Sequence, residues 1–444
     1  MAAPESPLVP NTSATKNGTL SHRRKPSGRG QVMGARDTPL NRQKSISKRR
    51  KSPSLSRRCK RFAVRHTWTI PLLLLLVFFS LYSLNPTESN IIHHFIFPSY
   101  KEQSRTEIGT DASKPPQYGK GLWDIAFVSF YTIVLSFTRE FIMQELLLPL
   151  ARFSGIKSHS KQSRFAEQMY TAIYFGLMGP AGLYVMRQTP VWYFNTSGMY
   201  EFFPHRTHQA EFKFYYLFQA AYWTQQAIVM LLGMEKPRKD YRELVAHHIV
   251  TVSLIALSYR FHFTYMGIAV YVTHDISDFF LAVSKSLHYL DSILVAPLFA
   301  LNIGVWIYLR HYQNLRIILS LFNEFQTVGS YELNWETQQY KCWISNIITF
   351  GLLAALQTLN IFWLYCLLRS MYRYLRYNVK KDDRSEDESE PEETEREKEA
   401  EKTKKTNVAA LVERQWNRRY SANGVMKATG NGTAAPPMKW ESAQ

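Results

Sequence analysis

Apolar segments alternate with polar stretches along the middle of this 444-residue chain. An α-helix needs about 20 apolar residues to cross the ~30 Å hydrocarbon core of a bilayer. The apolar segments of about this length lie near residues 67–84, 121–138, 169–187, 213–233, 244–259, 264–284, 297–314 and 345–368. The pattern therefore predicts an all-α polytopic membrane protein with about eight transmembrane helices.

An even number of spans places both ends of the chain on one side of the membrane. Basic residues before the first span, and the sequence RSMYRYLRYNVKK after the last, indicate that this side is the cytosol, because positive charge is enriched in cytosolic loops. The basic loops at 151–166 and 234–243 agree with this orientation. Arg310, His311 and Arg316 are expected on the lumenal side, and they break the trend.

The loop at 188–212 is also expected on the lumenal side. It contains Asn195 in the sequon NTS. Because glycans are attached on that side, Asn195 is a predicted glycosylation site.

The formal net charge of +19 is concentrated before the first span. Residues 1–66 contain 17 Lys and Arg against only Glu5 and Asp37, and they are rich in Ser, Pro and Gly. Such a segment could bind nucleic acid, but its position beside a span favours attraction to anionic lipid. We therefore predict a disordered basic cytosolic tail over residues 1–66 and no nucleic-acid partner.

The other end of the chain is dominated by like charges. The sequence DDRSEDESEPEETEREKE predicts a second disordered cytosolic tail over residues 379–444. Ser385 and Ser389 each have acidic residues at positions +1 and +3, which acidophilic kinases prefer, so both are predicted phosphorylation sites. The alternative is a tail whose acidic residues serve only for solvation.

Ionisable side chains interrupt two consecutive apolar segments. His247 and His248 lie in the fifth, and Asp275 and Asp278 lie in the sixth, next to His274. A charged group within a span costs at least ~2.5 kcal/mol, so such residues usually have a partner or a function. The two aspartates are three residues apart and share a helix face. We expect the His and Asp pairs to meet in the cytosolic half of the membrane.

Several functions could use this cluster. The four side chains could lock two helices together without any catalytic role, or they could form a proton or ion relay in a transporter. They could also serve acyl transfer, with a histidine as general base or nucleophile and a carboxylate that orients it. In that case the flanking cations could bind the phosphates of coenzyme A; these are Lys236, Arg238, Lys239 and Arg242.

Metal chemistry is not indicated by the sequence. Di-iron lipid oxidases use HxxHH boxes, and the chain has only one HxxH, His205 to His208, far from the histidine pair. The cysteines Cys59, Cys342 and Cys366 show no metal-ligand spacing either. We expect no metal site and no permanently bound cofactor.

The residues around the cluster resemble a known family. The run RKDYRELVAHHIVTVSLIALSYRFHFTYMGIAVYVTHDISDFFLAVSKSL, residues 238–287, is similar to the Lag motif of ceramide synthases, including the HH pair and the D-x-x-D pair. The stretches FTREFIMQELLLPLA and LQTLNIFWLYCLLRSMYR look like the fungal members. The resemblance covers about residues 60–380.

This resemblance implies an eight-span enzyme of the endoplasmic reticulum membrane that transfers a fatty acyl group from acyl-CoA, as cosubstrate, to the amine of a sphingoid base. A TLC catalytic domain is expected at 166–378, preceded by two spans and their loops at 67–165. His247 and His248 match the essential histidine pair of the family, and Asp275 and Asp278 match its acidic pair. A non-catalytic TLC protein, which binds lipid or associates with the translocon, is the alternative, but such members lack both pairs.

Further implications come from the fungal members. They suggest a very-long-chain acyl donor, a small single-span accessory subunit and kinase control through the acidic tail, and they leave the oligomeric state open. The sequence does not decide between direct attack of the amine on the thioester and an acyl-histidine intermediate. Trp223 and Tyr271 are candidate hydrogen-bond donors to the reacting carbonyl, although aromatic residues in spans more often serve for packing.

Overall fold

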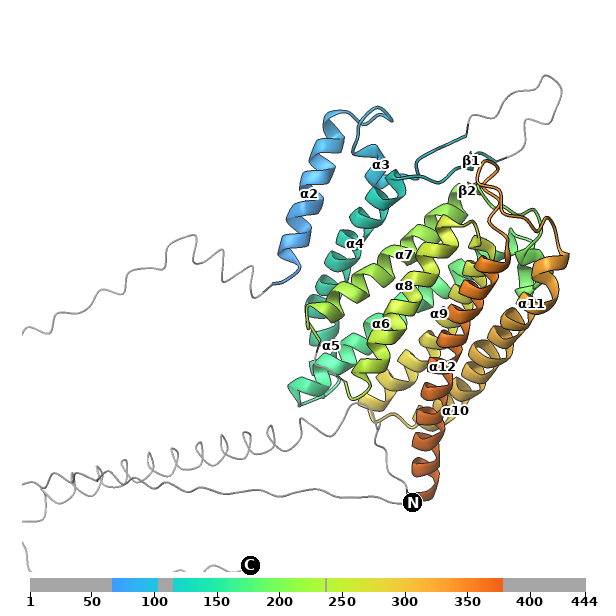
Figure 1. Ribbon diagram of the computed structural model, residues 1–444. Helices are drawn as coiled ribbons and strands as arrows, with labels where there is room; N and C mark the ends of the chain where they lie inside the picture. Colours follow the sequence, from blue (N-terminus) through green and yellow to red (C-terminus); the bar gives the residue numbers. More distant parts are fainter. Residues whose placement is uncertain (1–65, 103–114, 236–237, 378–444) are drawn as a thin grey trace, which may run out of the picture. The chain divides into compact units, whose positions relative to one another are not determined.

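The computed structural model describes residues 66–102, 115–235 and 238–377 (Figure 1). All of these residues fall within one compact unit, Leu55–Gln444. The predictions for the basic and acidic tails, for Lys236 and for the phosphorylation sites Ser385 and Ser389 lie outside the described residues.

The described chain is almost entirely helical, as predicted. The longer helices are α2 (Thr69–Leu84), α4 (Trp123–Phe141), α6 (His159–Arg187), α7 (Ala210–Leu231), α8 (Tyr241–Arg260), α9 (Thr264–Tyr289), α10 (Val295–Trp306), α11 (Asn314–Thr327) and α12 (Trp343–Tyr377). Shorter elements are α3 (His93–Ile96), α5 (Leu148–Phe153), the π-helical turns η1 (Ile142–Leu147) and η4 (Ile307–Gln313), and the 3₁₀ turns η2 (Trp192–Phe194) and η3 (Ser197–Met199). Strands β1 (Gln117–Tyr118) and β2 (His208–Gln209) form a two-stranded antiparallel sheet.

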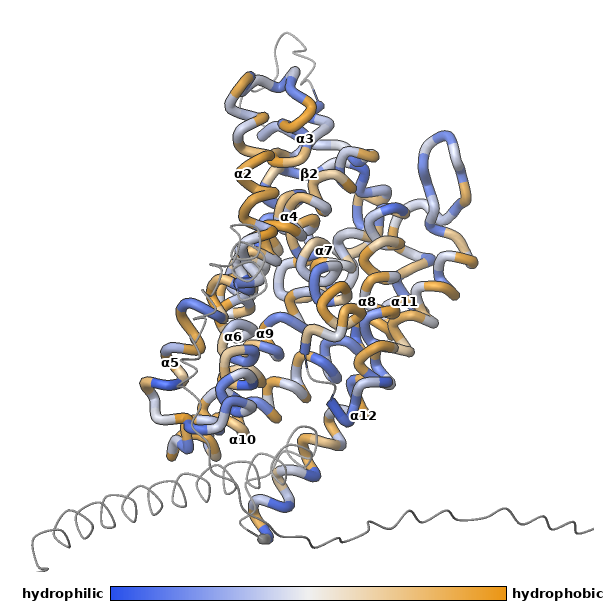
Figure 2. Tube along the Cα trace, turned by 90° about the vertical axis from the view of Figure 1, so that its left-hand side faces the viewer, coloured by the Kyte–Doolittle hydropathy of each residue, from blue (hydrophilic) through white to orange (hydrophobic). Residues whose placement is uncertain are grey.

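Each predicted apolar segment coincides with a helix, and the composition of the helices identifies a membrane protein. Among the described residues, three helical stretches are long and apolar enough to cross a bilayer: Trp123–Phe153, Thr264–Tyr289 and Trp343–Arg376. The helix Thr69–Leu84 is apolar but shorter. Hydrophobic residues recur along the helices (Figure 2), and many large ones are exposed, among them Leu73, Leu177 and Ile361. The count of eight spans stays a prediction.

The seventh predicted segment extends further than its hydropathy indicates. Helices α10 and α11 are joined without a break by the π-helical turn η4, so the helix runs from Val295 to Thr327. The expected position of Arg310 on the lumenal side of the membrane stays a prediction. Arg310 lies in the middle of a continuous helix, and its side chain is only 2% exposed.

Small residues allow α6 and α9 to pack closely. Gly176, Gly179 and Gly182 recur every three residues on α6 and face α9. A Cβ atom at Gly182 would lie 2.9 Å from Val272 Cγ2, closer than real side chains approach. As in other membrane bundles, the missing side chains let the two backbones come together. This contact holds the Asp275 segment of α9 in the centre of the bundle.

The bundle has two distinct ends (Figure 1). We call the end that carries β1 and β2 the sheet end. Helix α7 starts there and descends to the opposite end, where α8 starts and runs back. The first turns of α8, with the histidine pair, therefore lie near the opposite end.

Candidate active site

His247 and His248 are buried near the start of α8. Aromatic rings surround His247: its ring centroid lies 5.6 Å from that of Trp223 on α7 and 5.2 Å from that of Trp363 on α12. The two imidazoles are 5.8 Å apart. Three helices thus fix the position of the pair.

The hydrogen bonds of the two histidines differ. His248 Nδ1 lies 2.9 Å from the Leu244 carbonyl, which can only accept, so this nitrogen carries the proton. Neutral His248 therefore keeps Nε2 free to accept a proton. His247 Nε2 lies 3.5 Å from the Thr251 hydroxyl, and its Nδ1 is buried with no partner among the described residues. Each ring keeps one nitrogen available for chemistry.

Asp275 is fully buried, and its contacts are with α7 rather than with the histidines. The Tyr215 hydroxyl donates to Asp275 Oδ2 at 3.0 Å, and the Gln219 amide donates to the same oxygen. The Gln219 carbonyl accepts from Tyr174 of α6 at 3.0 Å. Asp275 thus anchors a polar network that joins α6, α7 and α9.

Asp278 faces a different partner. Its carboxylate forms an ion pair with Arg310, with 2.6 Å between Oδ1 and Nη2. Arg310 also donates from Nε to the Ser277 hydroxyl at 2.6 Å and from Nη1 to Asn360 at 3.2 Å, and it stacks on Trp306. Every face of this buried cation is therefore occupied.

The predicted His and Asp residues meet in one region, but the described residues show no direct hydrogen bond between the two pairs. Instead, His247, His248, Asp278 and Arg310 line the same polar cavity of about 440 Å³. This polar cavity lies at the end of the bundle opposite the sheet. Among its other lining residues are Arg139, Glu167, Arg238 and Lys285.

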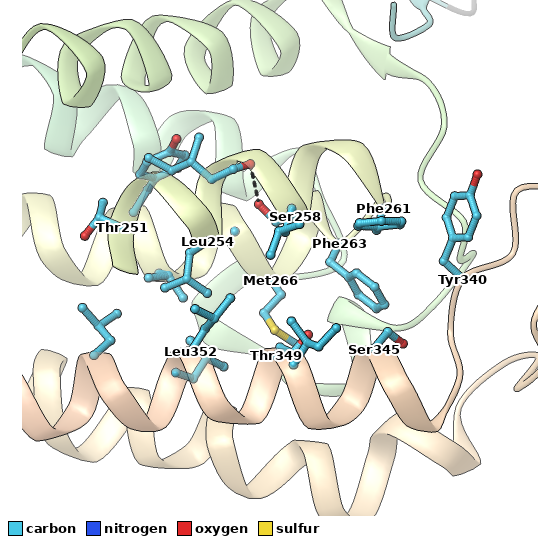
Figure 3. Close-up of a pocket in the computed structure, with 18 of the residues that line it drawn as sticks. Thr251, Leu254, Ser258, Phe261, Phe263, Met266, Tyr340, Ser345, Thr349 and Leu352 are labelled. Atoms are coloured by element: carbon cyan, nitrogen blue, oxygen red, sulfur yellow. Dashed lines mark hydrogen bonds between the residues drawn. The ribbon is translucent and has the colours of Figure 1, made fainter. Parts of the chain in front are cut away.

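A second, apolar cavity of about 240 Å³ extends from His247 toward the sheet end. Figure 3 shows its walls: Thr251 and Leu254 of α8 point across the space toward Thr349 and Leu352 of α12, with Met266 beside them. Its far end is bordered by aromatic side chains, including Phe261, Phe263 and Tyr340. The lining is almost wholly hydrophobic, as in pockets for hydrocarbon chains.

The two cavities meet at His247. Among the described residues, only His247 and Trp223 line both the polar and the apolar cavity. The indole Nε1 of Trp223 is buried and has no hydrogen-bond partner in the described part of the chain, and the same is true of the Tyr271 hydroxyl, which lines the apolar cavity. Unpartnered buried donors beside a histidine are available to a ligand.

The predicted basic residues around the histidine pair are not all placed alike. Arg238 lines the polar cavity and pairs with Asp240, with 3.1 Å between Nε and Oδ1. Asp240 also accepts a hydrogen bond from the indole of Trp363, which links Arg238 to the ring that contacts His247. Lys239 and Arg242 are exposed and do not line the cavity.

Two further predictions concern the sheet end. Asn195 is exposed there, and its side-chain amide donates to the Pro190 carbonyl at 3.2 Å. His205 and His208, the HxxH pair, are buried in this region, with hydrogen bonds to the His262 carbonyl and the Thr264 hydroxyl. No group of metal-ligating side chains is found within the described residues.

Sequence reasoning missed several members of the site. In the sequence Arg310 is a charged residue in an apolar segment, and Gln219 is a polar residue in another. Neither feature reveals which residue the side chain contacts. Trp363 carried no signal, because a tryptophan in a membrane span is usually a packing residue. Contacts between segments far apart in the chain decided all three positions.

Residues 164–369 match the TLC domain. A sphingosine N-acyltransferase-like protein, FUM17, from Gibberella moniliformis is 56% identical over 324 residues, which cover 73% of this chain and 83% of the relative. Sphingosine N-acyltransferase lac1 from Schizosaccharomyces pombe is 47% identical, with 77% of this chain and 87% of the relative covered. Ceramide synthase LAG1 from Saccharomyces cerevisiae is 48% identical, with coverage of 72% and 76%. The chain therefore belongs to the sphingosine N-acyltransferase family of TLC-domain proteins.

Proposed function

We propose that this protein is a ceramide synthase, which transfers the fatty acyl group of acyl-CoA to the amine of a sphingoid base. The observation that carries the proposal is the position of His247, where a polar cavity meets an apolar one. An acyl-CoA thioester has the same division, because a charged nucleotide head is joined to a hydrocarbon chain at the reacting carbon. Membership of the sphingosine N-acyltransferase family supports the same reaction.

In this proposal the head of acyl-CoA occupies the polar cavity. Arg238 and Lys285 line it and would contact the phosphates, whereas Lys239 and Arg242 point elsewhere. The acyl chain occupies the apolar cavity between α8, α9 and α12. The thioester carbon then lies beside His247.

The chemistry requires a general base for the amine and a hydrogen-bond donor to the carbonyl oxygen. When the amine attacks the thioester carbon, a new C–N bond forms, the C–S bond breaks, the amine loses a proton and the thiolate of coenzyme A leaves. His248 Nε2 or the free nitrogen of His247 takes the amine proton and passes it to the thiolate. The indole N–H of Trp223 stabilises the carbonyl oxygen as negative charge develops on it.

The aspartates act at a distance in this scheme. Asp275 holds Tyr215 and Gln219 and so keeps α7, with Trp223, in register with α9. Asp278 balances the charge of Arg310 within the polar cavity, which would otherwise oppose the formation of imidazolium nearby. Both residues are thus positioning residues.

Finer assignments complete the proposal. The donor is a very-long-chain acyl-CoA, and an accessory single-span subunit joins the enzyme. The protein lies in the endoplasmic reticulum membrane with both termini in the cytosol. Asn195 is glycosylated, and Ser385 and Ser389 are phosphorylated. These assignments rest on the resemblance to the fungal members and on the charge pattern of the sequence.

Ceramide formation in membranes that contain this chain tests the function. The membranes receive a sphingoid base and a series of acyl-CoA lengths, and His247→Ala is compared at equal protein level. We expect CoA-dependent ceramide formation that falls by about 10²-fold or more in the variant, the usual contribution of a general base. Absence of wild-type activity, with an accessory subunit supplied, would contradict the proposal.

A second experiment separates the two routes to the amide. The protein is incubated with acyl-CoA alone, and the peptide that covers His247 and His248 is examined by mass spectrometry. An acylated histidine indicates nucleophilic catalysis, in which the imidazole attacks first and the amine resolves the acyl-imidazole. An unmodified peptide, under conditions where added amine gives product, indicates direct attack.

A further inference from the structure

A third cavity lies at the sheet end. His247 and His248 do not line it. It has a volume of about 1130 Å³ and is bordered by α4, α7 and α8. Helix α7 forms its floor with Leu217, Ala220 and Thr224, which recur every three or four residues on one face. The floor therefore extends for about two helical turns, or ~10 Å, below the rim. We call this space the lateral groove.

The deeper walls of the lateral groove are apolar and exposed. Ile125 of α4 is 65% exposed and Val252 of α8 is 37% exposed, and Ala256 of α8 lies one turn further along. Helix α4 belongs to a stretch that is long and apolar enough to cross a bilayer. The groove thus faces the hydrocarbon of the membrane, where a polar ligand alone would not enter.

The rim of the groove, by contrast, is cationic. Lys120, Arg206 and Arg260 line it, and none of them forms an ion pair within the described residues. Lys120 contacts the Tyr259 carbonyl at 3.3 Å and His262 Nδ1 at 3.2 Å. The guanidinium of Arg260 lies over aromatic rings instead of a carboxylate.

The acidic residues nearby do not neutralise this rim. Asp124 lines the groove, but its carboxylate is already engaged by Lys213 at 2.7 Å and by the Tyr259 hydroxyl at 2.8 Å. Glu102 is the other acidic residue in the lining, and it is exposed. Three cations therefore face one uncommitted carboxylate across the rim.

Burial disfavours the charged form of Lys120 unless an anion lies nearby. Burial holds the pKa of Lys120 well below its usual value, and the charge of Asp124 raises it only in part. The adjacent His262 has a pKa lowered to about 3, by burial and then by the charge of Lys120, so it is neutral at physiological pH and accepts from the lysine. A bound anion would restore the preference of Lys120 for its charged form.

We propose that the lateral groove binds one phospholipid of the leaflet at the sheet end, with its phosphate against the three rim cations and an acyl chain along the trough. Only an amphiphile satisfies both parts of the groove, because cations at the rim need an anion and the trough needs hydrocarbon. This binding site is separate from the acyl-transfer site and goes beyond the proposed function. Of the residues that the structure describes, Tyr216 and Ile255 alone line both the groove and the apolar cavity.

Photolabelling tests the proposal on the full chain. The protein is reconstituted in bilayers with a phosphatidylcholine that carries a photoactivatable group on one acyl chain, and labelled peptides are identified by mass spectrometry. We expect strong labelling of peptides that cover 217–224 and 252–260. Loss of the charge-assisted contacts in a K120Q/R206Q/R260Q variant should reduce this labelling about tenfold. Arg187→Gln removes an exposed cation from the last turn of α6 and serves as the matched control.

A second variant changes shape without changing charge. Ala256→Trp fills the trough from an exposed position and should also abolish labelling, whereas Ile249→Trp, on an exposed part of α8 outside the groove, should not. Millimolar inorganic phosphate should leave the labelling unchanged. Displacement of the label by phosphate would overturn the assignment to a lipid. Equal labelling of all membrane-facing helices, or protection of the groove by a copurifying transmembrane protein, would overturn it as well.

Discussion

At the scale of single residues, Trp223 offers a sharp test of the chemistry. Its indole N–H is buried, unpartnered in the described part of the chain and next to His247. Trp223→Phe keeps an aromatic ring but removes the donor, so we expect kcat to fall by about 10²-fold with little change in KM, because the bond forms only as charge develops. Steady-state kinetics checks this. Trp192 at the sheet end is exposed and lines neither cavity, so Trp192→Phe serves as the control.

The ion pair between Asp278 and Arg310 leads to a second prediction for single residues, which concerns thermal stability. Removing one partner leaves a buried, uncompensated charge, which costs about 3–5 kcal/mol. Asp278→Asn and Arg310→Met should therefore each lower the thermal stability of the purified protein more than the double variant does. Thermal unfolding in detergent measures the coupling. Additive losses in the double variant would show that the two side chains do not depend on each other.

At the scale of elements, the contact between α6 and α9 decides where the acidic pair lies. Gly182→Ala places a Cβ against the Tyr215 hydroxyl of α7 and against Val272 of α9, which must both shift, and we expect a loss of about 1–3 kcal/mol in stability together with reduced activity. Gly304→Ala is the control, because a Cβ there meets open space and alanine favours the helix. Thermal unfolding and ceramide formation of both variants check the prediction. Equal behaviour of the two variants would argue against close packing at Gly182.

The same scale shows what the sequence could predict. The length and hydropathy of the apolar segments identify the helices, since crossing a bilayer demands about 20 apolar residues wherever the chain does it. The seventh predicted segment ended at residue 314, whereas the π-helical turn η4 and α11 continue the helix to Thr327, where the sequence is less apolar. The meeting of His247 with Asp278 in one cavity was predictable from antiparallel neighbours. The rotation of α9 that turns Asp275 toward Gln219 could not be predicted from the sequence, because it depends on packing against α6 and α7.

At the scale of the whole molecule, the proposed function treats the two cavities that share His247 as one site, and this has a measurable consequence. In the proposed function the head of acyl-CoA lies at one end of the bundle and the thioester beside His247, so the space beyond His247 would limit the length of the acyl chain. Along α8, Ser258 lies 11 residues beyond His247, about 16 Å.

Thr349 of α12 points into this part of the apolar cavity (Figure 3). Thr349→Trp should therefore shift the preferred donor to shorter acyl-CoA. Ile347→Trp, exposed on the same helix and outside the cavity, should leave the preference unchanged. Mass spectrometry of the ceramides formed from an equimolar mixture of acyl-CoA lengths measures the shift, and an identical product profile in the two variants would place the acyl chain elsewhere.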